Sequence, residues 1–135
     1  MKFQACDDMK RLEEICKNSG SPRVKKSAAF LRTAQWQGKE KGNFIAETIY
    51  DFAFYAGTFC KAHFNLVDCA VVQEKHGQGI GTILVSRMKQ KCLERNIRVI
   101  RLRTAIDETA VDFWQKQGAK IVGYKGEDYV MEIDL

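Results

Sequence analysis

The sequence has 135 residues, a formal net charge of +5 at pH 7, and 45% hydrophobic and 29% charged residues. This length suits one domain spanning residues 1–135, and the composition excludes a disordered or low-complexity chain. No apolar run approaches the roughly 18 residues that cross a membrane, and the N-terminal residues lack the apolar segment of a signal peptide. We therefore expect a cytoplasmic protein with no membrane partner.

The positive charge favours an anionic partner without specifying it, because nucleic acid, acidic protein and a polyphosphate ligand would all be attracted. Nucleic acid is the least favoured of these, since the sequence lacks an aromatic and basic motif of the RRM type. The five cysteines form no C-x-x-C pair and have no histidine at ligand spacing. They are predicted to be reduced, mostly buried thiols, with no metal site or disulfide framework.

The first half of the chain is predicted to contain one short strand and two helices. Residues 2–6 suit a strand, and residues 7–18 suit an amphipathic helix that one of the two initial aspartates caps. A second helix is predicted to begin at Ser21 and Pro22, a capping residue followed by proline in the first turn. The sequence GKEKGN ends this helix.

The rest of the chain is richer in strands. Residues 43–72 predict two or three antiparallel strands, with Gly57 as a turn or bulge signal. A glycine-rich turn leads into a helical stripe over residues 80–95, and residues 96–104 suit another strand. A short helix and a hairpin that turns near residues 125–128 follow. This order predicts an α+β fold with a mixed, mostly antiparallel twisted sheet flanked by helices.

The strongest functional signal is the stretch HGQGIGT, residues 76–82, between a predicted strand and a predicted helix. Backbone N–H groups in such a turn and the positive end of the helix dipole can converge on a phosphate. Two common phosphate-binding motifs do not fit: a P-loop requires a lysine after its glycine, and the dinucleotide motif requires glycine where Thr82 stands. The alternative is that the glycines only form a tight connection between two packed elements.

Two motifs in this half of the sequence resemble those of the GNAT superfamily of N-acetyltransferases. The first is V-x-x-x-(R/Q)-G-x-G-x-G followed by an amphipathic helix, and it matches Val72 and residues 76–81. The second is N-x-x-A-x-x-F-Y-x-x-x-G-F, which here has Asp107, Ala110, Phe113, Trp114, Gly118 and Ala119. The resemblance covers residues 66–135 well, and it implies a GNAT fold with acetyl-CoA as the acyl donor.

The resemblance also implies which residues bind the cofactor. The pyrophosphate would contact the N–H groups of residues 77–82, where glycine permits close approach to the backbone, and an N–H near residues 70–72 would stabilise the oxyanion. The cofactor-binding set predicted in this way is Ala70, Val71, Val72, His76, Gly77, Gln78, Gly79, Ile80, Gly81, Thr82, Asp107 and Trp114.

The sequence departs from the family pattern at two positions that matter for the chemistry. Trp114 stands where the family has the tyrosine that protonates the departing thiolate, and an indole cannot do this. Tyr124 could take over, the thiolate could leave unaided, or the protein could bind acyl-CoA without turnover. Trp114 itself is interpreted first as core packing beside Phe113. His76 replaces an arginine or glutamine, and a neutral imidazole can donate one hydrogen bond to phosphate but brings no full charge.

A general base is needed because an ordinary amine is protonated at neutral pH. Some family members place a glutamate at the position of Asn65. Asp68 is the nearest ionisable residue on the same predicted strand, and burial would raise its pKa, which suits a base. A purely structural, hydrogen-bonded aspartate is the alternative interpretation. His63 and Glu47 are weaker candidates of the same kind.

In the family, the second helix and the final hairpin form the acceptor cleft. The basic residues of that region, which hint at an acidic acceptor, are Arg23, Lys25, Lys26, Arg32, Lys39 and Lys41. A solvated helix face is the alternative interpretation. The predicted function is transfer of an acetyl group from acetyl-CoA to a primary amine of a small molecule or protein, by direct attack in a ternary complex. The competing hypothesis is a non-catalytic acyl-CoA-binding or regulatory module, and the paired C-terminal strands fit either a monomer or a homodimer.

Overall fold

The computed structural model describes residues 1–21 and 23–135, and within these residues it confirms the predicted α+β class. The strands are β1 (Phe3–Ala5), β2 (Phe44–Ile49), β3 (Ala53–Phe59), β4 (Phe64–Val71), β5 (Val99–Ala105), β6 (Ala119–Lys125) and β7 (Asp128–Asp134). The helices are α1 (Met9–Lys17), α2 (Val24–Lys41), α3 (Ile80–Glu94) and α4 (Glu108–Lys116), with a short 3-10 turn, η1 (Gln73–Lys75). None of the helices in these ranges is both long and apolar enough to traverse a lipid bilayer.

The ends of the first two helices follow from local side-chain chemistry. Asp8 caps α1, because its carboxylate accepts a hydrogen bond of 3.1 Å from the N–H of Lys10. The predicted start of α2 at Ser21 was too early: Arg23 is the residue before the helix, and the Ser21 hydroxyl accepts from the Arg23 N–H at 3.1 Å in the preceding turn. Pro22, which was predicted to occupy the first turn of α2, lies outside the described residues.

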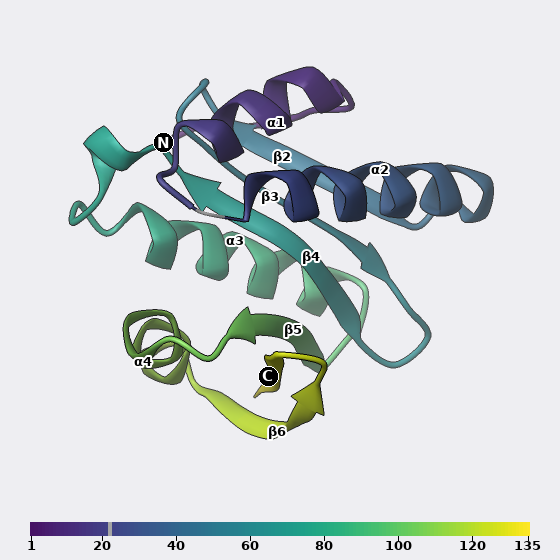
Figure 1. Cartoon of the computed structure of the whole chain (residues 1–135). Coiled ribbons are helices and arrows are strands. Elements are labelled where there is room, and N and C mark those ends of the chain that lie inside the picture. The colour runs from purple at the N-terminus through teal and green to yellow at the C-terminus, as the bar shows by residue number, and fades with distance from the viewer. Residues whose placement is uncertain (22) are drawn as a thin grey trace.

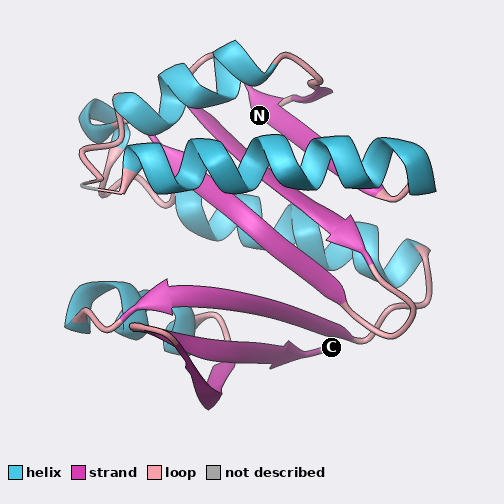
Figure 2. Cartoon of the chain, turned by 45° about the vertical axis from the view of Figure 1, so that its right-hand side comes forward, coloured by secondary structure: helices cyan, strands magenta, loops and turns pink. Residues whose placement is uncertain are grey.

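The strands form one seven-stranded sheet with the order β1-β2-β3-β4-β5-β7-β6. All neighbouring strands are antiparallel except β4 and β5, which are parallel because α3 connects them. Helices α1 and α2 cover one face of the sheet, and α3 packs on the other (Figures 1 and 2). This places the glycine-rich turn, which precedes α3, at the edge where β4 ends.

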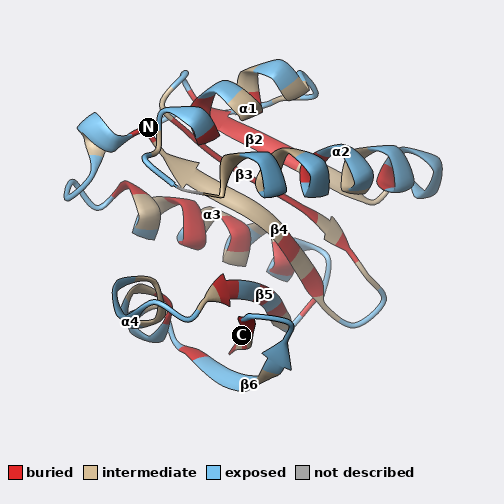
Figure 3. Cartoon of the chain, viewed as in Figure 1, coloured by how far each residue is buried: buried red, intermediate tan, exposed pale blue. Residues whose placement is uncertain are grey.

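Both faces of the central strands are buried, so the core lies on both sides of the sheet (Figure 3). Along β3, Ala53 and Tyr55 pack toward α3, while Phe54 and Ala56 pack toward α1 and α2. This alternation explains why β3 is an almost continuous apolar run. Gly57, predicted as a turn or bulge, lies at a register shift between β3 and β4. A Cβ atom there would lie 2.5 Å from the Asn65 carbonyl oxygen, so only glycine fits.

Candidate active site

A cleft opens where β4 and β5 separate. The two strands pair only at Phe64 with Ile100 and at Asn65 with Arg101, and beyond that point they diverge (Figure 1). The cleft has a volume of about 1240 Å³ and is lined by α2, β4, the glycine-rich turn, the first turn of α3, β5 and α4. Its volume exceeds the roughly 300–1,000 Å³ typical of small-molecule pockets, so it has room for a large ligand.

The glycines of the turn have two different structural roles. Gly77 and Gly79 have φ angles of +78° and +77°, in the left-handed region, and a Cβ atom at either position would meet nothing within 4 Å. A Cβ atom on Gly81 would lie 3.0 Å from the ring of Phe113. Within this chain, therefore, backbone conformation accounts for Gly77 and Gly79, and close packing of α4 accounts for Gly81. The space beside Gly77 and Gly79 stays open toward the cleft.

The turn also leaves a row of backbone donors free. Among the described residues, the N–H groups of residues 77–82 have no hydrogen-bond partner, and the first N–H that is paired again is that of Ile83, which donates to Gly79 at 3.2 Å. Gly79, at the N-cap of α3, provides no side-chain cap. Free N–H groups at the start of a 15-residue helix, next to its positive dipole end, are the arrangement that binds phosphate groups.

The His76 side chain forms a hydrogen bond within the protein that the sequence did not predict. Its Nε2 atom lies 2.8 Å from the carbonyl oxygen of Val71, and since a carbonyl can only accept, the ring donates from Nε2. The one N–H of a neutral imidazole is therefore already used to close the turn onto β4. Only the imidazolium form would have a second N–H, on Nδ1, to offer a phosphate.

The end of β4 presents one backbone N–H to the cleft. Val72 donates its N–H to Phe52 at 2.8 Å, so it is excluded as the predicted oxyanion donor. Hydrogen bonds to β3 alternate along an antiparallel strand, so Ala70 also faces β3 and Val71 faces the cleft. The bond from His76 to the Val71 carbonyl agrees with this direction. Of the three predicted residues, Val71 is thus the one positioned to donate.

Asp68 lies on β4 beneath α2 and lines the cleft. One of its carboxylate oxygens accepts from the Cys69 N–H at 2.8 Å, and the other accepts from the Cys16 thiol at 3.5 Å. Burial raises the pKa of Asp68, and hydrogen bonds from Ser27 and Cys16 only partly oppose this effect. A carboxylate with a raised pKa at the wall of a cleft is suited to accept a proton.

Tyr124, which the sequence suggested as a general acid, lies outside the set of residues that line the cleft. Its side chain is 70% exposed and contacts the ring of Tyr129, with 5.1 Å between the ring centres. Successive strand residues point to opposite faces, and Lys125, its neighbour on β6, is the residue that lines the cleft. A bulge between Ile121 and Gly123 contributes to this register, and no residue pattern predicts it.

Trp114 and Asp107, from the second motif, both line the cleft. Trp114 is buried against Phe113 at the wall of the cleft, with 5.0 Å between the ring centres in an edge-to-face arrangement. Asp107 caps α4 by accepting from the Ala110 N–H at 3.1 Å. The described residues that line the cleft include no tyrosine, so no phenol is available there to protonate a leaving group.

The weaker base candidates lie elsewhere. Glu47 is buried on the α3 side of the sheet, where its carboxylate binds Arg87 at 2.9 Å and accepts from the Tyr55 hydroxyl, outside the cleft. His63 lines a separate, smaller pocket. Its pKa is lowered mainly by burial and to a smaller extent by the charge of Arg101. Asn65 lines both pockets but carries no ionisable group.

The remaining predicted cofactor residues divide into those inside the cleft and one outside it. Ile80 and Thr82 line the cleft, and Thr82 accepts a 3.1 Å hydrogen bond from the Gln117 amide. The exposed side chain of Gln78 lies outside the cleft lining. The lining residues that sequence reasoning missed include Phe30, Arg103 and Lys125. No local motif marks them, because they come from three elements that only the fold brings together.

Comparison with known proteins gives a family match. The model of the acetyltransferase (GNAT) family matches residues 32–119 of the sequence. A comparison with curated protein sequences gives no match.

Several solved structures share the fold. The chain is similar to the PaiA N-acetyltransferase of Thermoplasma acidophilum in complex with coenzyme A, with a TM-score of 0.76, 18% identity and coverage of 100% of both chains. It is also similar to the ribosomal-protein-S18-alanine N-acetyltransferase of Escherichia coli, with a TM-score of 0.75, 15% identity and coverage of 98% of this chain and 92% of that one. An aminoglycoside 6′-N-acetyltransferase complexed with coenzyme A has a TM-score of 0.72 and 16% identity, over 99% of this chain and 97% of that one. Because the family model matches more than half of the sequence, the chain belongs to the GNAT acetyltransferase family.

Proposed function

We propose that residues 1–135 form one acyltransferase domain that transfers an acetyl group from acetyl-CoA to the amino group of a small molecule or a protein. Acetyl-CoA, which supplies the acetyl thioester, is the usual co-substrate of the family. The observation that supports this most is the row of unpaired N–H groups at residues 77–82, which opens into the cleft at the start of α3. These donors would hold the pyrophosphate of the cofactor.

Three groups of the chain would serve the transfer itself. The backbone N–H of Val71 would donate to the carbonyl oxygen of the acetyl group as negative charge develops on it. The carboxylate of Asp68 would take a proton from the attacking amine, because its raised pKa makes it a stronger base than an exposed aspartate. The new bond joins the amine nitrogen to the acetyl carbon as the carbon–sulfur bond breaks.

The thiolate would leave without a protein acid and take its proton from solvent. The ordinary pKa of a thiol, about 8.5, makes it a moderate leaving group near neutral pH. The described residues that line the cleft offer no tyrosine for this step. The same observation favours the second candidate function, a module that binds acyl-CoA without turnover.

Thermal unfolding with acetyl-CoA, CoA, NAD and ATP at matched concentrations tests the binding step. At a hundred times its dissociation constant, a ligand adds about 2.7 kcal/mol to the free energy of unfolding. We expect stabilisation by the two CoA forms only. Absence of any shift would remove the cofactor assignment.

Release of free CoA thiol in the presence of a panel of amines tests turnover. We expect at least one amine to accelerate release above the rate of acetyl-CoA hydrolysis. Binding of acetyl-CoA with no accelerated release by any amine would favour the non-catalytic module.

A further inference from the structure

An ion cluster around the buried Asp128 carboxylate spans the cleft between α2 and the β5–β7 part of the sheet. The Asp128 carboxylate, whose side chain is only 4% exposed, lies at the start of β7. It accepts a hydrogen bond from Arg23 and forms an ion pair with it at 3.0 Å, the Arg103 guanidinium of β5 lies 3.1 Å away, and the Lys26 ammonium lies 3.9 Å away. Because Arg23 precedes α2 and Lys26 lies in its first turn, their ion pairs with Asp128 cross the opening left by the divergence of β4 and β5.

The cluster leaves this side of the cleft with excess positive charge. Burial raises the pKa of Asp128, but the hydrogen bond and charge of Arg23 and the charges of Lys26 and Arg103 lower it below its usual value, so the carboxylate is ionised. Three cations therefore surround one anion, and Lys125 adds a fourth cation to the lining.

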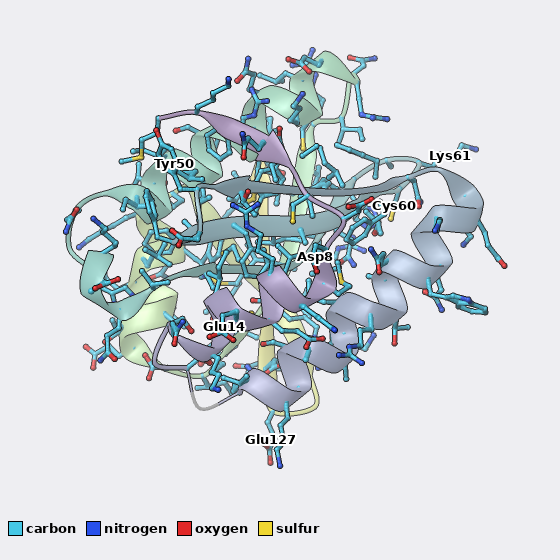
Figure 4. The ribbon with its side chains drawn as sticks, turned by 90° about the horizontal axis from the view of Figure 1, so that it is seen from above. Asp8, Glu14, Tyr50, Cys60, Lys61 and Glu127 are labelled. Atoms are coloured by element: carbon cyan, nitrogen blue, oxygen red, sulfur yellow. The ribbon has the colours of Figure 1, made fainter. Side chains whose placement is uncertain are left out.

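Two other carboxylates line the cleft, and both are engaged elsewhere. Asp107 caps α4 by accepting from a backbone N–H of that helix. Asp68 is buried on the neighbouring wall, with its oxygens engaged by Cys69 and Cys16. Glu127, in the turn between β6 and β7, extends outward from the molecule (Figure 4) and is not part of the cleft lining. An anionic ligand group would therefore meet unbalanced positive charge.

An apolar side chain lies between two of these cations. Phe30 of α2 lines the cleft with 43% of its surface exposed. The Lys26 ammonium and the Arg103 guanidinium each lie 5.9 Å from its ring centre. Their side chains are 46% and 34% exposed, so both keep N–H donors for a further partner. This pocket therefore combines an apolar surface with two partly free cations.

We infer that the acceptor amine carries a carboxylate, which Lys26 and Arg103 bind while the adjoining carbon chain packs on Phe30. The inference rests on the proposed acyl transfer, whose acceptor it specifies. Of the six basic residues that hinted at an acidic acceptor in the sequence, only Arg23 and Lys26 line the cleft. Arg32 instead pairs with Glu13 on the outer surface. Polycationic acceptors would be repelled by the same charges.

Matched amines test this specificity. ω-Amino acids with one to five methylene groups, and phenylalanine, would each be compared with the corresponding carboxamide, and spermidine would serve as a polycation. The measured quantity is kcat/KM for CoA release. We expect the best carboxylate to exceed its carboxamide at least tenfold, with the preference declining as salt increases, and spermidine to be the poorest acceptor.

Two variants locate the effect. Lys26→Gln should reduce the carboxylate preference several-fold, and Lys26→Glu should remove or reverse it, with melting temperatures close to that of the original protein because Lys26 is half exposed. Lys25→Gln is the control, since Lys25 neighbours Lys26 on α2 but does not line the cleft, and it should keep the full preference.

The outcomes separate this inference from the proposed function. Equal or better turnover of the carboxamides, or an equal effect of the Lys25 and Lys26 variants, would overturn the inference and leave acyl transfer intact. If no amine is turned over, the anion site is tested by calorimetry, which compares the affinities of N-acetyl-6-aminohexanoate and its carboxamide for the CoA-saturated protein. Tighter binding of the carboxylate would support the anion site although acyl transfer had failed, and equal binding would overturn it.

Discussion

Asp68 is the residue on which the proposed proton transfer depends. Asp68→Asn keeps the shape of the side chain but removes the base, so we expect kcat to fall at least about 100-fold while acetyl-CoA still binds. In the original protein, kcat/KM should fall as the pH drops through the raised pKa of Asp68. Steady-state rates from pH 5 to 9 and the thermal shift with acetyl-CoA measure both effects. Unchanged kcat would show that Asp68 is structural.

The same substitution has a pH-dependent effect on stability. The pKa of Asp68 is raised in the folded state, so folding favours its protonated form, and this stabilising contribution is lost as the pH rises through the raised pKa. Asparagine cannot ionise. The melting temperature of Asp68→Asn relative to the original protein should therefore be higher at pH 8 than at pH 5, and scanning calorimetry at the two pH values checks this.

Tyr124 provides a complementary test. Its side chain is 70% exposed on the outer face of β6, so Tyr124→Phe should change neither kcat nor the melting temperature beyond about twofold and about 1 °C. A large loss of kcat, with acetyl-CoA binding intact, would restore Tyr124 as the general acid and contradict the observed register of β6.

At the scale of elements, the turn before α3 is tested by a pair of glycines with the same backbone conformation. Gly79 has φ = +77° and Gly42, which ends α2, has φ = +67°, and neither would place a Cβ atom within 4 Å of the protein. Alanine at either position should cost about 1 kcal/mol of unfolding free energy. Gly79→Ala should also weaken acetyl-CoA binding at least tenfold, whereas Gly42→Ala should not. Equal affinities in the two variants would place the cofactor elsewhere.

A buried ion pair joins β2 to α3. Burial raises the pKa of Glu47, but hydrogen bonds from Arg87 and Tyr55 lower it below its usual value, so the pair stabilises the fold at neutral pH and is lost as the pH falls through that lowered pKa. Arg87→Met would leave the carboxylate without its cation and should cost about 3 kcal/mol in urea unfolding at pH 7. Arg101→Met, which breaks the more exposed pair with Glu132, should cost less than about 1 kcal/mol. Equal costs would contradict the buried character of the first pair.

At the scale of the whole molecule, the sequence predicts the elements well because each has a local signal. Asp8, the alternating strand residues and the glycines before α3 act within a few residues of chain, so capping, periodicity and turn chemistry reveal them. The acceptor side of the cleft has no such signal. Phe30, Arg103 and Asp128 meet only because α2, β5 and β7 converge, and the exposure of Tyr124 depends on the β6 register, which has a bulge that no residue pattern announces.

The divergence of β4 and β5 has a consequence for amide hydrogen exchange. Beyond Asn65, β4 has a strand partner on one side only, so protection should alternate along it. The Val72 amide, bonded to Phe52, should exchange slowly, while the adjacent Val71 amide exchanges much faster in the free protein. Acetyl-CoA should selectively slow exchange of the Val71 amide. The exchange rate of this single amide would then report whether the acyl donor is bound.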